Sequence, residues 1–358
     1  MEVKTAVLLC AGMGSRLWPV TLRKPKILVE VAGRTILDRI FDALIAAGIE
    51  KAVLVVSPAD IQTEKHLRDH PPGGLDVTTV VQHDPRGLGD ATARAKDAVG
   101  DSPFLLYLGD ELIEGGIGNF VERARHTDAQ ALVLLKEVED PRRFGVAVMQ
   151  GDSIVKLIEK PVDPPSPMAV VGLYAFEPTI FEAIAKTPES KRREIEITDS
   201  IQTMVDDGHR VVGVPFNLEW FDVGTFDSLL EANRALLDRE VTDLPQPMGE
   251  RSSIQGHVRI SHDVTITDSE IIGPVIIGRG CKITNSRVGP HVCLGDATRI
   301  TDSAVEDCII GTLSVVERTV KLAHSVLDSE VIVDGAGLRV RLQVHGGQRS
   351  TVSLEPVE

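Results

Sequence analysis

The sequence predicts two folds in one chain, a doubly wound α/β domain followed by a parallel β-helix. The first prediction depends on apolar strand patterns that alternate with amphipathic helix patterns between residues 3 and 110. The second depends on a repeat of 17 residues in the C-terminal part of the chain. Because a doubly wound sheet binds ligands at the carboxyl ends of its strands, we expect a site in the loops at those ends.

The elements of the α/β domain can be assigned in order along the chain. Residues 3–10 form a nearly continuous apolar run, which predicts a strand buried on both faces of a parallel sheet. Residues 35–48 place apolar side chains at helical spacing and end at Gly48, where a glycine commonly stops a helix. The same alternation predicts strands at residues 52–57, 77–82 and 104–110, and helices at residues 59–70 and 89–99.

The C-terminal part follows a different period. The motif Ile-Thr-Asp-Ser or Ile-Thr-Asn-Ser begins at residues 266, 283 and 300, a spacing of 17. This spacing is close to three hexapeptides, and it predicts a parallel β-helix in which each coil buries its aliphatic side chains against the next. Cys281 falls at a coil position that is small or apolar in the neighbouring coils, so we expect it to be structural.

The boundary between the two folds is expected in the polar, proline-bearing stretch 238–253. We therefore predict domains at residues 1–238 and 250–345. The period is lost after about residue 335, and the last residues, 346–358, are expected to fray.

Composition limits the classes of function. Apolar residues make up 42% of the chain and charged residues 25%, and no apolar run is long enough to cross a membrane. The N-terminal run contains Glu2 and does not read as a secretory signal, so we expect a cytoplasmic protein. The four cysteines lack a C-x-x-C spacing, which argues against a zinc site or a disulfide framework. A formal charge of −15 argues against nucleic acid as a partner.

The run LLCAGMGSRLWPVTLRKPK, residues 8–26, follows the first strand and carries glycines and basic side chains. A dinucleotide-binding loop does not fit, because Leu17 replaces the third glycine and the second strand ends without an acidic residue for a ribose. A Walker loop does not fit either, since no Gly-Lys-Ser/Thr follows. The run is compatible with a plain tight turn, but its free N–H groups, Arg16 and Lys26 also suit a triphosphate.

The run and six later motifs occur together in one known order. The later motifs are LGD at 108–110, FGV at 144–146, EKP at 159–161, VGLY at 171–174, REIEITD at 193–199 and WFDVGT at 220–225. Together they resemble the sugar-1-phosphate nucleotidyltransferase family, and most of all its long glucose-1-phosphate thymidylyltransferases. The resemblance implies a Rossmann-like mixed sheet of the nucleotide-diphospho-sugar transferase type, followed by a left-handed β-helix.

The resemblance also implies a reaction. A glucose-1-phosphate oxygen attacks the α-phosphorus of TTP or UTP in line, which gives dTDP-glucose or UDP-glucose and expels pyrophosphate. No covalent protein group is needed, so catalysis consists of positioning and charge neutralisation. By resemblance, Asp110 and Asp222 hold a catalytic Mg²⁺, the one cofactor expected. Asp110 ends an apolar strand, which puts it at the ligand edge of the sheet.

Family positions imply a role for each further site residue. Arg16, Lys26 and Lys160 are the expected catalytic cations. The expected nucleotide-binding residues are Ala11, Gly12, Gly14, Ser15, Arg16, Gln82 and Gly87, of which the last two read the pyrimidine edge. The expected sugar-phosphate residues are Gly145, Glu159, Lys160, Val171 and Arg192. Arg193 replaces the usual glycine beside Arg192, so either arginine is a candidate for the sugar phosphate. Lys24 is expected to be a solvated surface residue.

Three departures from the thymidylyl enzymes leave the base open between TTP and UTP. Those enzymes usually have glycine in place of Ala11 and asparagine in place of Glu111. They also have an Ala-His or Ala-Gln pair where this chain has Gly89 and Asp90. Ala11 makes the loop similar to that of many uridylyltransferases.

Three alternatives remain from the sequence. The β-helix could be an acyltransferase with a histidine base, taken from His257, His262, His291 and His324, although each lies in a polar turn. The chain could prefer GTP, as GDP-mannose-type pyrophosphorylases do. It could also be a non-catalytic regulatory subunit, but all the expected cations and carboxylates are present. We expect a homo-oligomer that associates through the β-helix, with small molecules as the other partners and no membrane partner.

Overall fold

The computed structural model describes residues 1–243 and 251–335, and the backbone of residues 340–346 and 351–356. The chain packs as two compact units. The first unit comprises Met1–Met13, Pro25–Ile27 and Leu37–Trp220, and the second comprises Gly14–Lys24, Leu28–Ile36 and Phe221–Glu358. These units differ from the domains expected at 1–238 and 250–345, which stay a prediction.

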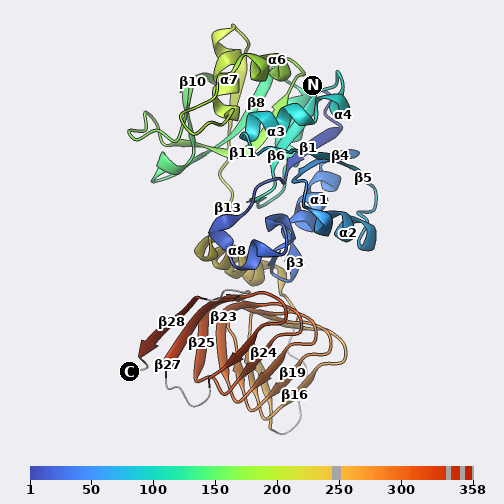
Figure 1. The fold of residues 1–358 in the computed structure, drawn as a ribbon, viewed down its shortest axis with the longest axis vertical. Helices are drawn as coiled ribbons and strands as arrows, with labels where there is room; N and C mark the ends of the chain where they lie inside the picture. The colour runs from blue at the N-terminus through green and yellow to red at the C-terminus, as the bar shows by residue number, and fades with distance from the viewer. Residues whose placement is uncertain (244–250, 336–339, 347–350, 357–358) are drawn as a thin grey trace. The chain divides into compact units, whose positions relative to one another are not determined.

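The first unit is built on a sheet of nine strands, counted over the described residues, in the order β5-β4-β1-β6-β11-β8-β12-β10-β9 (Figure 1). The first four of these strands run parallel, whereas β11 pairs antiparallel with both β6 and β8, so the sheet is mixed. The strands are β1 Thr5–Leu9, β4 Lys51–Val56, β5 Asp76–Val81, β6 Phe104–Leu108, β8 Ala131–Glu137, β9 Gly145–Gln150, β10 Ser153–Glu159, β11 Met168–Phe176 and β12 Val211–Pro215. The predicted doubly wound, Rossmann-like sheet is confirmed.

Helices complete this unit, and their apolar sides form its core. Strands β1, β6, β8 and β11 share one buried cluster with the apolar residues of α3, α6 and α7. Burial of these faces is the main favourable term in folding of the unit. The helices are α1 Ile36–Ala46, α2 Ile61–Asp69, α3 Leu88–Arg94, α4 Lys96–Val99, α5 Gly118–Arg125, α6 Ile180–Lys186 and α7 Ile197–Asp206. The helix expected at residues 89–99 is therefore two helices that meet at Ala95.

The short elements of the chain include turns of 3₁₀ helix and pairs of brief strands. The 3₁₀ turns are Ser15–Leu17, Val20–Leu22, Lys26–Leu28 and Pro141–Arg143. The brief strands are β2 Glu30–Val31, β3 Arg34–Thr35, β7 Glu111–Ile113 and β13 Trp220–Asp222. Helix α8, Phe226–Glu240, begins at Thr225, whose hydroxyl accepts a hydrogen bond from the Ser228 N–H at 3.2 Å.

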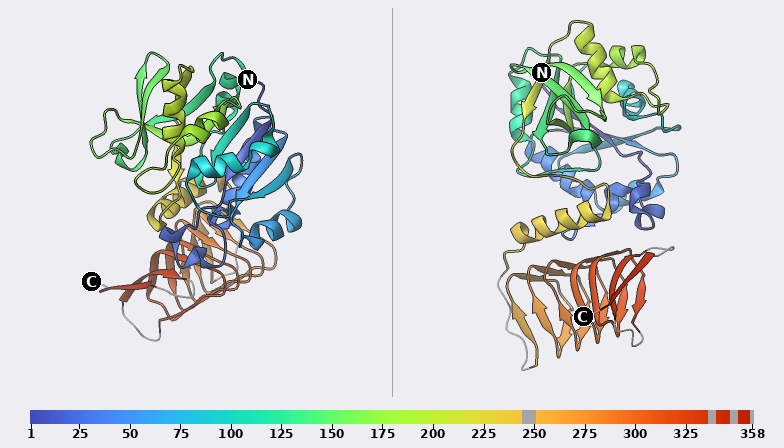
Figure 2. Two further views of the ribbon diagram at one scale, coloured as in Figure 1. Left: turned by 45° about the horizontal axis from the view of Figure 1, so that its top comes forward. Right: turned by 90° about the vertical axis from the view of Figure 1, so that its left-hand side faces the viewer.

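The second unit contains stacked coils of short parallel strands, as expected of a parallel β-helix (Figure 2). The expected spacing of 17 is the strand register, since Ile271 pairs with Val288 and Val288 with Val305. The strands are β14 Ser253–Gln255, β15 Val258–Ile260, β16 Thr265–Thr267, β17 Glu270–Ile272, β18 Val275–Ile277, β19 Lys282–Thr284, β20 Arg287–Val288, β21 Val292–Leu294, β22 Arg299–Thr301, β23 Ala304–Ile310, β24 Val315–Glu317, β25 Lys321–Leu327 and β26 Ile332–Asp334.

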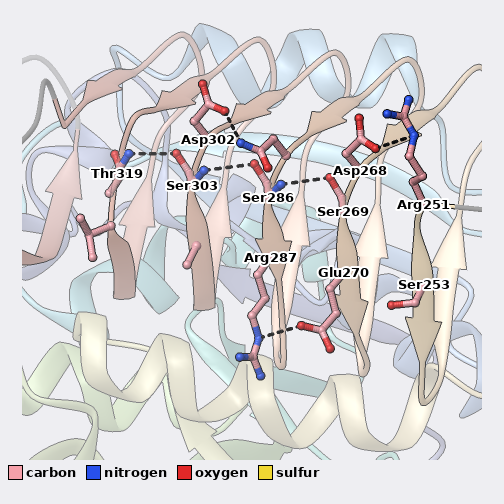
Figure 3. Close-up of a pocket in the computed structure, with 13 residues that line it drawn as sticks. Arg251, Ser253, Asp268, Ser269, Glu270, Ser286, Arg287, Asp302, Ser303 and Thr319 are labelled. Carbon is pink, nitrogen blue, oxygen red and sulfur yellow. Dashed lines mark hydrogen bonds and ion pairs between the residues drawn. The ribbon is translucent and has the colours of Figure 1, made fainter.

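The repeated Ile-Thr-Asp/Asn-Ser motif explains how each coil turns a corner. The isoleucine points into the core, and Ile283 and Ile300 are fully buried. The third residue has a left-handed backbone, with φ of 51° at Asp268 and 47° at Asn285, a conformation that Asp and Asn tolerate better than most residues. The serine then joins successive coils, because the Ser269 hydroxyl accepts the N–H of Ser286 at 3.1 Å (Figure 3).

Two further expectations for this unit are settled by the structure. Cys281 is fully buried and, like Cys10, Cys293 and Cys308, is a free thiol, so its structural assignment is confirmed. The expected fraying of residues 346–358 is wrong for Thr351–Pro356. This segment forms strand β28, which pairs antiparallel with β27, Val340–Gly346. Pairing with a neighbouring strand gives the segment backbone hydrogen bonds that the loss of sequence period does not reveal.

Among the helices of the described residues, none combines the length and the apolar character that a membrane span requires.

The β-helix core yields a prediction about stability. Ile300 is fully buried in the coil stack, and Arg299 beside it is exposed. Ile300→Ala should cost about 2–5 kcal/mol, because it removes buried methylene groups and leaves a cavity. Arg299→Ala should leave the melting temperature nearly unchanged. Calorimetry of the full chain measures the melting temperature of each variant. Equal melting temperatures for the two variants would contradict the packing of aliphatic side chains between successive coils.

Candidate active site

The best-defined charged contact at the ligand edge of the sheet joins Lys26 to Asp110. Strand β6 ends at Leu108, which lies in register with Leu9 of β1, so Asp110 follows the carboxyl end of a central strand. The Lys26 Nζ lies 2.7 Å from the Asp110 Oδ2, and their side chains are 10% and 35% exposed. The lysine is thus nearly buried, while its carboxylate partner stays open to a ligand.

Gly109 explains why the LGD motif needs its glycine. A Cβ at this position would lie 2.9 Å from the carbonyl oxygen of Leu9 and 2.9 Å from a methyl carbon of Ile27. Both distances are too short for a side chain. The glycine therefore lets the end of β6 approach the end of β1, which brings Asp110 to the same edge as Lys26.

A second group of site residues gathers around Glu159, the last residue of β10. Its Oε1 lies 3.3 Å from the Lys160 Nζ and 3.0 Å from the Arg192 Nη2. Its Oε2 accepts a hydrogen bond from the Thr198 hydroxyl at 3.0 Å. Two expected sugar-phosphate cations therefore meet at one carboxylate. Arg192, and not Arg193, makes the contact with Glu159.

The Arg192 guanidinium is also held from its own segment. Its Nε donates to the Glu196 Oε1 at 3.1 Å, its Nη2 lies 2.8 Å from the same oxygen, and the Glu196 side chain is only 4% exposed. The Ser190 hydroxyl donates to the same oxygen at 2.8 Å. Nearby, burial and the carboxylates of Glu196 and Glu159 raise the pKa of Asp199 above its ordinary value. The sequence motifs predicted a role for Arg192 but none for Glu196.

Gly145 lies directly beside the Glu159 group. A Cβ at Gly145 would lie 2.6 Å from the Thr198 Cγ2 and 3.5 Å from the Glu159 Oε2, so a larger residue here would displace the Glu159 group. Val171, in the middle of β11, is fully buried. The next residue, Gly172, has φ of 83° in the left-handed region, which favours glycine.

A third group surrounds Gln82, which directly follows β5. The Gln82 Nε2 donates to the Asp90 Oδ2 at 2.9 Å and to the Gly87 carbonyl oxygen at 3.3 Å. Gly87 has φ of 98°, and a Cβ there would lie 2.7 Å from the carbonyl oxygen of Ile195. Gln82 and Gly87 are therefore in contact, as expected of two residues with one role. Asp90, noted in the sequence only as a departure, is the third member of this group.

The remaining expected residues of the glycine-rich run divide between the two units. Ala11 and Gly12 belong to the first unit, and a Cβ at Gly12 would meet no atom within 4 Å. In the second unit, Gly14 has φ of 59° and precedes the 3₁₀ turn that begins at Ser15. Gly12 and Ser15 are exposed, and Ala11 and Gly14 are half-buried.

Arg16 and Asp222 lie together in the second unit, on either side of Gly224. A Cβ at Gly224 would lie 2.6 Å from the Arg16 Nη2 and 2.7 Å from the Asp222 Oδ1. The glycine of WFDVGT is therefore needed to make room for both charged groups. Asp110 belongs to the first unit and Asp222 to the second, so their shared metal site stays a prediction.

Lys24 corrects an expectation. It was expected to be solvated, but its Nζ lies 2.8 Å from the Asp328 Oδ1, and the two side chains are only 26% and 15% exposed. Both residues belong to the second unit. A sequence separation of about three hundred residues left no local signal from which this pair could be predicted.

The broad trough on the β-helix does not have the features of a reaction site (Figure 3). Ser269, Ser286 and Ser303 each use the hydroxyl twice: Ser286, for example, donates to the Thr284 carbonyl oxygen and accepts the N–H of Ser303. Figure 3 shows the charged rows at its edges, where Arg287 faces Glu270. Its polar groups therefore serve the stacking of the coils.

No cluster of three or more potential metal-ligating side chains occurs among the residues that the structure describes. Asp110 nevertheless has the chemistry of a Mg²⁺ ligand, since carboxylate oxygens are the donors this ion prefers. Only its Oδ2 is engaged by Lys26, and the side chain is 35% exposed. Asp110 therefore fits as one ligand of a divalent cation.

A mixed, doubly wound sheet with charged side chains at the carboxyl ends of its strands is typical of a ligand-binding α/β protein. Comparison with known proteins narrows the class. Residues 5–239 match the family model described as nucleotidyl transferase, and the chain belongs to this family.

Relatives and solved structures are similar over most of the same region. The chain is 36% identical over 257 residues to the low-salt glycan biosynthesis nucleotidyltransferase Agl11 of Haloferax volcanii, covering 71% of this chain and 72% of the relative. It is 36% identical over 273 residues to a glucose-1-phosphate thymidylyltransferase of Streptomyces antibioticus, covering 76% and 77%. UDP-glucose pyrophosphorylase from Acinetobacter baumannii has a similar structure, with a TM-score of 0.60 and 27% identity over 66% of this chain and 94% of that one. The chain is thus an enzyme of the sugar-1-phosphate nucleotidyltransferase class.

The Lys24–Asp328 pair yields a prediction. Because both side chains are mostly buried, Lys24→Met and Asp328→Asn should show a coupling of about 1 kcal/mol in a double-mutant cycle on thermal unfolding. The matched control is the pair Lys186–Asp207, which has a similar distance of 2.7 Å but side chains that are 58% and 40% exposed. The control cycle should give a smaller coupling. Equal couplings, or none at the first pair, would contradict the assignment.

Proposed function

We propose that this enzyme transfers a uridylyl or thymidylyl group from UTP or TTP to glucose-1-phosphate and releases pyrophosphate. The observation that carries the proposal is the meeting of Lys160 and Arg192 at the Glu159 carboxylate. Two cations beside a hydrogen-bond acceptor match a ligand that carries a phosphate and a hydroxyl group. The similarity to glucose-1-phosphate thymidylyltransferases and to a UTP–glucose-1-phosphate uridylyltransferase of Haloferax volcanii supports the same substrates.

In this proposal the residues act by position and charge. Lys160 and Arg192 bind the sugar phosphate and orient its oxygen, while Glu159 accepts a hydrogen bond from a sugar hydroxyl. Gly145 and Val171 shape the sugar pocket. Lys26 and Arg16 bind the phosphates of the nucleotide and stabilise the charge that develops as pyrophosphate leaves. No side chain needs to form a covalent bond with the substrate, because positioning of the two phosphates brings nucleophile and phosphorus together.

The nucleotide is proposed to lie along the glycine-rich run. Backbone N–H groups at Ala11, Gly12, Gly14 and Ser15 contact its phosphates, and Gln82 and Gly87 contact the edge of its pyrimidine. The left-handed φ of Gly14 and the open space at Gly12 support close approach of a phosphate to the backbone.

Mg²⁺ is the proposed cofactor, and Asp110 and Asp222 would hold it. When bound, the ion neutralises phosphate charge and orients the phosphate oxygens. Asp110 in addition fixes the Lys26 ammonium through their 2.7 Å contact. Removal of the Asp110 carboxylate would therefore affect both the metal and the lysine.

Three finer expectations also belong to the proposal. The coils of the β-helix are proposed to wind in the left-handed sense. The β-helix is proposed to mediate self-association. The protein is proposed to act in the cytoplasm. The similarity of the chain to long relatives that match over more than its first 239 residues supports a role for the β-helix in the whole enzyme.

A second candidate function is favoured by one observation in the β-helix. Relatives named bifunctional protein GlmU include one from Methanocaldococcus jannaschii, 35% identical over 71% of this chain and 60% of that relative. Of the four candidate histidines, His291 lies with its Nε2 3.0 Å from the Oδ1 of the exposed Asp238. His324 instead contacts Asp307, a buried carboxylate that also pairs with Arg234 at 2.6 Å. A histidine oriented by a carboxylate can act as a base in acyl transfer. Turnover of acetyl-CoA that depends on His324 would support this function, and its absence would exclude it.

The proposal predicts which nucleotides are used. Pyrophosphate release should be rapid with UTP or TTP and glucose-1-phosphate, and at least about tenfold slower in kcat/KM with ATP and GTP, because the pocket at Gln82 is proposed to admit a pyrimidine. A coupled pyrophosphate assay with the four triphosphates and several sugar phosphates measures this. Preference for GTP with mannose-1-phosphate would overturn the choice of substrates.

A second prediction separates the sugar site from the nucleotide site. Lys160→Ala should raise the KM for glucose-1-phosphate by roughly ten- to a hundredfold and lower kcat, because a charge-assisted contact to the attacking phosphate is lost. The KM for the nucleotide should change little. Lys156→Ala is the control, since Lys156 is an exposed lysine on β10, the strand that Lys160 directly follows. An effect of Lys160→Ala confined to the nucleotide KM would reverse the placement of the sugar phosphate.

A further inference from the structure

We propose that Asp90 is a specificity-determining positioning residue, which fixes the side-chain amide of Gln82 so that its oxygen faces the nucleotide base. In this orientation Gln82 accepts a hydrogen bond, so among the pyrimidines the site selects those that carry a ring N–H, namely uracil and thymine. The inference rests on the proposed function, because it places the base at Gln82.

The orientation of the amide follows from its two partners. The Gln82 Nε2 lies 2.9 Å from the Asp90 Oδ2 and 3.3 Å from the Gly87 carbonyl oxygen. A carbonyl and an ionised carboxylate only accept hydrogen bonds, so the group that faces them must be the NH₂ and not the oxygen. Each of its two hydrogens then has a partner. The Gln82 Oε1 accepts no hydrogen bond from the described residues, and it is the end left for a ligand.

Asp90 is itself held in place. Its side chain is only 6% exposed, and its Oδ1 lies 2.7 Å from the Arg94 Nη2, one helical turn along α3. The two carboxylate oxygens thus have separate partners, Arg94 on one and Gln82 on the other. This arrangement leaves Asp90 no freedom to release the amide without losing a charge-assisted hydrogen bond.

The backbone on the other side of the amide is fixed as well. The Gly89 N–H donates to the Ile195 carbonyl oxygen at 2.8 Å, and the Ile195 N–H donates to the Arg86 carbonyl oxygen at 2.7 Å. These bonds tie the loop before α3 to the segment before α7. The Gly87 carbonyl therefore stays in position to accept from Gln82.

The hydrogen-bonding groups of each base determine whether this orientation of Gln82 favours it. Uracil and thymine carry a hydrogen on N3 between two carbonyl groups, whereas cytosine has a lone pair on N3 beside an amino group. An outward-facing Oε1 pairs with the N3–H of the first two but faces a lone pair on cytosine. A buried acceptor without its donor is costly, so such a site discriminates more strongly than one based on shape. Guanine and adenine fall under the proposed exclusion of purines.

The test compares UTP with CTP in the full-length enzyme. Asp90→Asn supplies an NH₂ group beside Gln82 or Arg94, which allows the Gln82 amide to turn and present its own NH₂. The ratio of kcat/KM for UTP to that for CTP should fall by roughly ten- to a hundredfold, while the KM for glucose-1-phosphate stays unchanged. Asp97→Asn is the control, because Asp97 is an exposed acid on the next helix and should leave the ratio as in the wild type.

Asp90→Ala is a second variant, which tests the same inference if Asp90→Asn folds poorly. Alanine favours the helix, and the Arg94 side chain, 45% exposed, stays solvated when its partner is removed. Its UTP-to-CTP ratio should fall in the same direction. An unchanged ratio in both variants, or an equal loss with UTP and CTP, overturns this inference and leaves the proposed function standing. A wild-type enzyme that releases no pyrophosphate with UTP or TTP overturns the proposed function, and this inference with it.

Discussion

The site depends on cations that are held in place, and the ion pair between Lys26 and Asp110 is one example. The chain has a formal charge of −15, yet its substrates are polyanions. A strongly acidic protein can bind them only where cations are concentrated and held. We propose that Lys26 serves this purpose, because it is almost fully buried and is oriented, at 2.7 Å, by a carboxylate at the end of a central strand. Gly109 permits the approach of the two strand ends that makes the pair possible.

The same arrangement recurs at the other cations. Lys160 and Arg192 share the Glu159 carboxylate, and Arg192 is further fixed by the buried Glu196. Such pairs contribute little to net stability, because removal of charges from water offsets most of their attraction. Their value is positional, since a cation already fixed in place loses less side-chain entropy when a phosphate binds. The carboxylates therefore take part in the architecture of the site as much as the cations do.

Much of the fold could be predicted from the sequence, because the deciding signals are local or periodic. The apolar run at residues 3–10 contains β1, and the spacing of 17 is the register that pairs Ile271 with Val288. The strand at Thr351–Pro356 was missed, because its pairing with β27 continues no period. The split of the helix at Ala95 was missed as well, and nothing in the apolar pattern marks it.

Only those site residues that belong to a sequence motif could be predicted. Family motifs marked Glu159, Lys160 and Arg192, and the structure brings these three together. Asp90 and Lys24 escaped because their roles depend on partners that packing supplies. Lys24 meets Asp328 across the length of the chain, and Asp90 meets Gln82 across the loop before α3. A residue that acts by orienting another residue belongs to no sequence motif that would reveal its role.

In the proposed reaction the two substrates react directly with each other, and no nucleotidyl group becomes attached to the enzyme. Exchange of radiolabelled pyrophosphate into UTP, measured with and without glucose-1-phosphate, tests this most directly. The account predicts that label enters UTP only when glucose-1-phosphate is present, because the nucleotidyl group must pass to the sugar phosphate and back. Label in UTP without the sugar phosphate would reveal a nucleotidyl group on the protein, and would contradict the account.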